Sequence, residues 1–298
     1  MLLKPNRLAL ALTLALSALP AGAIYAQDAD KTEDEAKTEA AELGTITVTA
    51  RKREETLQEV PIAVTAFSEQ KLEDFNVEDL SDLDAQVPNL TVYSARGSSS
   101  TITAYIRGVG QSDPLWGVDP GVGIYLDDVY VARPQGALLD VFDVERIEVL
   151  RGPQGTLYGK NTIGGAIKYV SRALDPDFGG KASVTLGTYN QQDVKASVNV
   201  PISESGWVAR FAAANLTRDG YGENIRTGQD VSDKEIVAGR FTLGYIGSDS
   251  WSMRFTADRI DDASAVRGAQ MLAVNRFAPT VPPLDDRYDV RNGMPNVN

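Results

Sequence analysis

The chain has 298 residues, a formal net charge of −12, and neither cysteine nor histidine. The missing residue types exclude disulfide bonds, thiol nucleophiles, histidine bases and zinc sites of the usual ligand kind. The negative charge argues against the binding of nucleic-acid phosphates as the main function, so we expect no nucleic-acid partner. The length suits about two domains.

The N-terminus has the pattern of an export signal. Two basic residues precede an apolar run at 8–19, and a proline and small residues follow it. This pattern predicts a secretory signal peptide over residues 1–26, cleaved after residue 23 or 26. The alternative, a membrane anchor, is disfavoured because the run is shorter than the roughly 20 residues that span a bilayer. We expect the mature chain to leave the cytoplasm.

An acidic leader and a short strand come next. Residues 27–44 are acidic, rich in alanine and free of aromatic residues, which predicts a flexible leader. Polar and apolar residues then alternate as in an extended strand, over Thr45, Ile46, Thr47, Val48, Thr49 and Ala50. Nothing before this strand could pair with it. We therefore expect an unpaired strand that is available to another chain.

Short mixed elements separated by glycine-rich loops predict a compact α+β domain over residues 55–172. We expect strands within 60–68, 101–110, 121–131, 143–155 and 164–172, a helix over 68–76 with Ser68 as its N-cap, and a second helix within 77–90 that ends before Pro88. Asp127 and Asp128 are expected in a hairpin turn or exposed loop, because neighbours on a strand point to opposite faces and could not converge on one substrate atom. Gln154 stands where a phosphate-binding loop needs glycine, which argues against nucleotide binding.

Charges of alternating sign surround apolar residues near the end of this domain. Glu145, Arg146, Glu148 and Arg151 flank Ile147. Since buried charges must be paired, we interpret them, together with Arg107, as an ionic seam against a partner surface. The alternative is a set of ordinary surface ion pairs, which would contribute little to stability.

Long two-residue alternation begins after residue 179. We expect strands at 181–189, 193–200, 207–218, 237–245 and 251–257. A soluble sandwich would fit alternation alone, but three details favour a membrane barrel: strand lengths near 9–11 residues, apolar faces that end in Trp or Tyr, and short turns that contrast with the long connection at 219–234. Five strands cannot close a barrel, so either 180–298 is the start of a longer one, which we expect, or its strands pair with another chain.

Several motifs resemble those of TonB-dependent outer-membrane receptors. The run at 144–171 resembles the end of their plug domain, 46–55 resembles their TonB box and the basic stretch after it, and 105–110 and 123–131 resemble other plug segments. The resemblance covers residues 45 to about 260. Lys168 departs from it, since many relatives carry Asn at this place.

The resemblance implies an α+β plug domain followed by the start of an antiparallel transmembrane β-barrel, which has about 22 strands in the family. It implies a location in the Gram-negative outer membrane, contact with its lipid, and active import of a scarce ligand. A ferric siderophore is the first expectation, and cobalamin or a carbohydrate the alternative. No cofactor, resident metal or enzymatic activity is expected. A non-transporting periplasmic binding module is the rival outside transport.

The resemblance also implies partners and sites. Residues 45–50 would pair as an added strand with the C-terminal domain of TonB, which the inner-membrane proton gradient energises. The short leader leaves no room for a signalling domain. Loops at the plug apex, around 94–100 and 111–119, would face the ligand through Ser94, Arg96, Ser98, Gln111, Asp113, Trp116 and Asp119.

Overall fold

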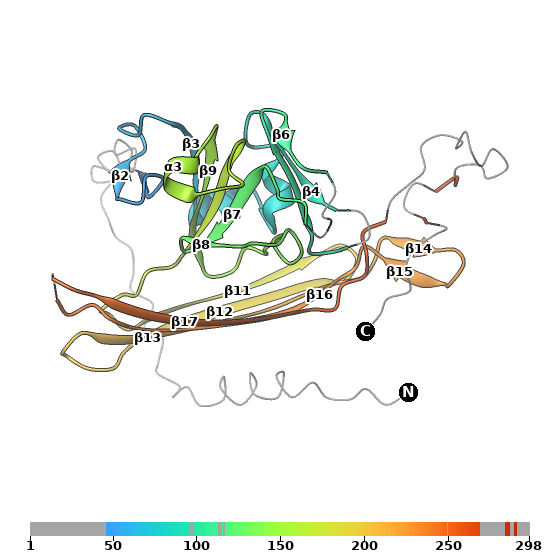
Figure 1. The fold of residues 1–298 in the computed structure, drawn as a ribbon. Coiled ribbons are helices and arrows are strands. Elements are labelled where there is room, and N and C mark those ends of the chain that lie inside the picture. The colour runs from blue at the N-terminus through green and yellow to red at the C-terminus, as the bar shows by residue number, and fades with distance from the viewer. Residues whose placement is uncertain are drawn as a thin grey trace, which may run out of the picture. The chain divides into compact units, whose positions relative to one another are not determined.

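A computed structural model describes residues 46–95, 98–112, 115, 117–248, 250–268, 284–286 and 289–290. The predicted signal peptide, the leader and Thr45 lie outside the described residues. The described elements form two parts, a mixed α+β plug and a broad antiparallel sheet (Figure 1). Within this described part, no helix is both long and apolar enough to cross a membrane.

A five-stranded mixed sheet is the centre of the plug. Its order is β3-β9-β10-β7-β8, with bounds Ala63–Ser68, Val144–Arg151, Gly165–Ser171, Val122–Leu126 and Val129–Tyr130. β10 and β7 run parallel, and the other neighbours are antiparallel. A second sheet joins β4 (Leu90–Ser94), β5 (Ile102–Ile106) and β6 (Val109–Gly110). Buried aliphatic side chains from both sheets form one core.

The helices of the plug are shorter than the sequence suggested. Helix α2, Glu69–Asp74, begins at the predicted N-cap Ser68, whose side chain accepts a hydrogen bond from the Lys71 amide. The predicted helix between 77 and Pro88 is wrong: only a 3-10 turn, η2 (Leu80–Leu83), forms there. Asp79 caps that turn, and β4 begins at Leu90. The apolar residues at helical spacing are nevertheless buried, so the pattern marked core positions correctly.

Tight turns divide two of the predicted strands. Arg107 and Gly108 both have positive φ, as do Asp127 and Asp128. Two successive positive φ values are typical of two-residue hairpin turns, whose twist matches that of the flanking strands. The stretch 101–110 therefore becomes β5 and β6, and 121–131 becomes β7 and β8. This confirms the hairpin turn that was expected at Asp127–Asp128.

The second part is a single curved sheet, which we call the wall sheet. Its strands in spatial order are β11 (Gly179–Gly187), β12 (Gln191–Pro201), β13 (Trp207–Arg218), β16 (Lys234–Tyr245) and β17 (Met253–Asp262). All neighbours are antiparallel, which confirms the five strands expected from the alternation. The long connection contains an unpredicted hairpin of β14 (Gly222–Asn224) and β15 (Gln229–Val231), visible at one end of the sheet in Figure 1.

The two faces of the wall sheet differ in chemistry. One face exposes large apolar side chains, including Val184, Leu186, Phe211 and Phe255. Tyr245 contacts both Trp207 and Trp251 at the end with short turns, as expected of an interfacial girdle. The opposite face carries buried polar and small residues, among them Asp193, Arg210, Ala212, Ala214, Arg240 and Thr242. This is the apolar-outside, polar-inside arrangement of a membrane β-strand wall.

Candidate functional site

The segment Ile46–Ala50 is paired with the chain that follows it. Strand β1 (Thr47–Val48) lies antiparallel to β2 (Glu55–Thr56), and the Leu57 amide donates to the Ile46 carbonyl at 2.9 Å. The expectation of an unpaired strand is therefore wrong. The partner strand, β2, follows β1 after a turn. The sequence did not reveal this pairing, because the charged residues of that stretch do not alternate with apolar ones.

Apolar burial also holds this segment to the plug. Val48 and Ala50 have no exposed surface, and they pack with Leu150 and Tyr158. The Tyr158 hydroxyl donates to the Ala50 carbonyl at 2.9 Å. Burial raises the pKa of Tyr158, with a further contribution from the carboxylates of Asp128 and Glu148, so the phenol stays protonated and able to donate. The segment is thus part of the plug structure in this state.

Thr49 lies against a group of charged side chains. Its amide donates to Glu148 Oε1 at 2.8 Å, and Lys168 Nζ donates to its hydroxyl at 2.7 Å. Arg146 joins the group through its contacts with Glu148, at 2.8 Å, and with the Thr49 hydroxyl, at 3.2 Å. Asp128 pairs with Lys168 at 2.8 Å. Sequence reasoning named Glu148 and Arg146 but did not connect them with Thr49.

The residues of the predicted ionic seam have partners inside the plug. Arg146 pairs with both Glu145 and Glu148, and Arg151 Nη1 lies 3.5 Å from the Pro88 carbonyl. The Arg107 amide donates to the Asn89 carbonyl at 2.8 Å. The physical reason is position: β9 lies between β3 and β10, so its side chains point into the plug layers. Their role as a seam against a barrel remains a prediction.

A different set of charged residues joins the plug to the wall sheet. Asp143 pairs with Arg210 at 2.5 Å, and both side chains are buried. The other pairs with the wall sheet are Glu69 and Glu73 with Lys181, and Glu78 and Asp140 with Lys234. Asp79 pairs with Arg267, which follows β17. For Lys181, Arg210 and Lys234, the signal that could have found them was a basic residue on the polar side of an alternating strand.

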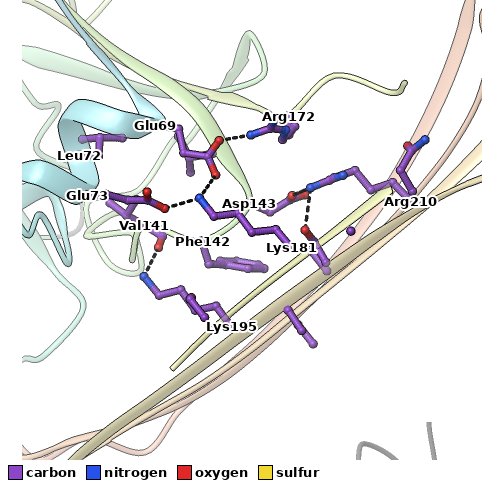
Figure 2. A pocket seen from close by; sticks show the side chains of 18 of the residues that line it. Glu69, Leu72, Glu73, Val141, Phe142, Asp143, Arg172, Lys181, Lys195 and Arg210 are labelled. Atoms are coloured by element: carbon purple, nitrogen blue, oxygen red, sulfur yellow. Dashed lines mark hydrogen bonds and ion pairs between the residues drawn. The ribbon is translucent and has the colours of Figure 1, made fainter. Parts of the chain in front are cut away.

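A cavity of about 520 Å³ lies between α2, the 141–144 segment and strands β11–β13 (Figure 2). Lys181 extends between Glu69 and Glu73 at one side, and Arg210 reaches Asp143 at another, as Figure 2 shows. Lys195 Nζ donates to the Val141 carbonyl at 2.8 Å. The plug–wall boundary thus contains ion pairs and open space beside one apolar contact, that of Phe142 with small wall residues.

The predicted ligand-facing loops are described only in part. Arg96, Asp113 and Trp116 lie outside the described residues. Ser98 has a local role, because its hydroxyl accepts from the Thr101 amide at 3.1 Å, and the Ser94 hydroxyl donates to the Ser98 carbonyl at 3.4 Å. Asp119 pairs with the exposed Lys160. Gln111 also has a partner. The ligand role of these loops remains a prediction.

Comparison with known proteins identifies the family. The model of the TonB-dependent receptor plug domain matches residues 56–166. The chain belongs to the TonB-dependent receptors. Among solved receptors, the ferric yersiniabactin uptake receptor FyuA of Yersinia pestis superimposes with a TM-score of 0.61 at 28% identity, over 67% of this chain and 31% of that one. The pyoverdine receptor FpvA of Pseudomonas aeruginosa, at 21% identity and a TM-score of 0.59, shares the fold.

Relatives of this chain include a protein named for vitamin B12 transport and one named for its regulation by iron. The vitamin B12 transporter BtuB of Vibrio vulnificus is 27% identical over 195 residues, and the iron-regulated outer membrane virulence protein of Vibrio cholerae is 31% identical over 202 residues. These alignments cover 64% and 63% of this chain, but 29% and 27% of the relatives. The chain thus spans less than a third of their length.

Proposed function

We propose that this chain is the plug-bearing part of a TonB-dependent active transporter of the outer membrane. In this role the wall sheet contributes to a barrel in lipid, the plug fills the lumen, and residues 45–50 pair with the C-terminal domain of TonB. Energy from the inner-membrane proton gradient then reaches the plug through that strand. No covalent chemistry is required, and we assign the chain no enzymatic activity.

The observation that carries this proposal is the combination of wall and plug. The wall sheet exposes an apolar face and turns a polar face, with Arg210 and Arg240, toward the plug. The half-exposed pairs, such as Lys181 with Glu69 and Glu73, can exchange protein partners for water at small net cost, whereas a continuous apolar interface cannot. A boundary of ion pairs and open space, with one apolar contact at Phe142, therefore suits a plug that must rearrange within a fixed wall.

We propose a ferric siderophore as the transported ligand. This choice follows the relatives, since FyuA is named for ferric yersiniabactin and FpvA for pyoverdine. Cobalamin is the second candidate, because BtuB is named a vitamin B12 transporter. Equilibrium titration of the chain in detergent with ferric yersiniabactin, ferric pyoverdine and cyanocobalamin would discriminate between the two classes. Saturable binding of cobalamin alone would overturn the siderophore assignment.

The coupling step is tested by titration with the purified C-terminal domain of TonB. A peptide of residues 45–50 and the full chain in detergent are compared with their Val48→Pro variants, since proline removes a backbone donor from a pairing strand. Saturable binding that Val48→Pro abolishes supports the proposal. Failure of the peptide to bind, where the box of another receptor binds, would overturn it. Recovery of the chain in the soluble periplasmic fraction would favour the rival binding module.

A further inference from the structure

The hydroxyl of Thr49 makes every hydrogen bond that a hydroxyl can make. A threonine hydroxyl offers one donor and two acceptor lone pairs. Here it donates to Glu148 Oε1 at 3.2 Å and accepts from Lys168 Nζ at 2.7 Å and from Arg146 Nη2 at 3.2 Å. Three charged side chains thus converge on one neutral oxygen. The site is selective for a hydroxyl, because an aliphatic side chain of the same shape would leave all three groups without this partner.

The backbone of Thr49 is engaged by the same side chains. Its amide donates to Glu148 Oε1 at 2.8 Å, and its carbonyl accepts from Lys168 Nζ at 3.3 Å and from the Lys52 amide at 2.9 Å. Strand addition requires backbone donors and acceptors of the added strand. In this state, those of Thr49 are already in use. An incoming strand must therefore compete with Glu148 and Lys168 for them.

These contacts matter for the stability of the plug because the charged side chains are buried. The Glu148 and Lys168 side chains are 0% and 2% exposed, and they stand opposite one another in the register of β9 and β10. Burying a charge is costly unless it is paired and hydrogen-bonded, so loss of Thr49 would leave both charges with fewer partners. The plug is therefore stabilised by keeping Thr49 in place, beyond the apolar packing of Val48 and Ala50.

We propose that Glu148, Lys168 and Arg146 form a latch for Thr49, which holds the 46–50 strand in the plug and competes with TonB for it. This inference rests on the proposed function and adds to it the residues that regulate the same strand. Thr49 and Lys168 are positioning residues in this scheme, since they set how often the strand is available. A docked strand cannot pair with TonB. The apparent affinity for TonB is therefore the intrinsic affinity multiplied by the fraction of time for which the strand is undocked.

The test separates docking from pairing by measuring each variant in two forms. Affinity for the TonB C-terminal domain is measured for the full chain in detergent and for the free 45–50 peptide. Thr49→Val removes the hydroxyl with little change in shape, and Thr49→Ser keeps it. Lys168→Met removes the ammonium group. Exposed residues elsewhere in the plug provide matched controls, Thr91→Val on β4 and Lys71→Met on α2.

We expect Thr49→Val and Lys168→Met to tighten binding of the full chain by at least about tenfold, the effect of losing one charge-assisted hydrogen bond. Thr49→Ser, Thr91→Val and Lys71→Met should bind like the unmodified chain. The Thr49→Val peptide should bind like the unmodified peptide, because the added strand is recognised through its backbone. Equal affinity of all full-chain variants, with a peptide that binds, would overturn the latch and leave the proposed function standing.

Hydrogen exchange gives a readout that does not involve TonB. Opening of the latch frees the Thr49 amide, so exchange over residues 46–50 should accelerate by at least about tenfold in Thr49→Val and remain unchanged in Thr49→Ser. Absence of peptide binding together with this acceleration would refute the TonB role and retain the latch. Unchanged exchange in Thr49→Val would refute the latch, whatever the peptide does. Should Lys168→Met fail to fold, the two Thr49 variants still decide the question.

Discussion

Replacement of Arg210 by methionine tests whether the plug and the wall sheet are joined by a buried ion pair. Arg210 donates to Asp143 Oδ1 from Nε at 2.9 Å and from Nη2 at 2.5 Å. Their side chains are 9% and 2% exposed. Removing one member of a buried pair costs about 3–5 kcal/mol, because the other charge stays buried. Arg240 Nη1 lies 3.3 Å from the Asp143 carbonyl, and its positive charge places the expected loss near the lower value, about 3 kcal/mol.

Urea unfolding of the full chain in detergent, followed by tryptophan fluorescence, measures this loss. Trp207 lies on the same strand as Arg210 and reports on the wall sheet. The double variant Asp143→Asn with Arg210→Met should recover most of the lost free energy, since no buried charge is then left alone. Arg259→Met provides the control, because Arg259 and Asp261 form an exposed pair and its removal should leave the midpoint unchanged. A loss below about 1 kcal/mol for Arg210→Met would refute the reasoning.

Three further predictions concern packing, pH and backbone geometry, each measured by the same urea unfolding. Phe142→Ala should cost about 3–5 kcal/mol, because this buried ring packs against small wall residues such as Ala214; a loss under about 1 kcal/mol would show that the contact is not formed. Burial of Asp79 opposes its ionisation, but Arg267 and hydrogen bonds outweigh burial and lower its pKa below 3.8. The stability that this pair adds should therefore be fully present above pH 3.8 and be lost as the pH falls through the lower, folded-state pKa. Arg267→Met should remove this part of the pH dependence of stability. Identical pH profiles for the variant and the unmodified chain would contradict the prediction. Gly165→Ala should cost at least about 2 kcal/mol, because φ is +151° and a Cβ would lie 2.2 Å from a backbone carbonyl oxygen; a neutral effect would be inconsistent with this geometry.

The wall strands could be predicted from the sequence because their environment has two sides. A strand between lipid and a polar interior must alternate, and each of the five alternating stretches became a strand. The hairpin at Asp127–Asp128 was also predictable, since its chemistry is local. The helix between 77 and Pro88 was mispredicted because helical spacing marks buried positions, which a 3-10 turn followed by an extended segment also supplies.

The docking of Thr49 could not be predicted, because it depends on contacts between distant parts of the chain. Glu148 and Lys168 lie 99 and 119 residues from Thr49, and no local pattern joins them. The alternating charges around Ile147 indicated that these residues need partners of opposite charge, but they did not indicate which residues those partners are. Their register on β9 and β10, which places Glu148 opposite Lys168, is a property of the folded sheet alone.

The β1–β2 pair has a mechanical consequence. Its two strands are joined by a turn at one end, and its open end holds the bond from the Leu57 amide to the Ile46 carbonyl. A force applied at Ile46 from the amino-terminal side loads that bond first and the next only after it breaks. Such unzipping needs far less force than sliding strands past each other, which would load all the bonds at once, because ladder bonds lie perpendicular to the strands. The strand pair should therefore yield early under tension, and the pull would pass next to Thr49 and, through Glu148 and Lys168, to the middle of the central sheet.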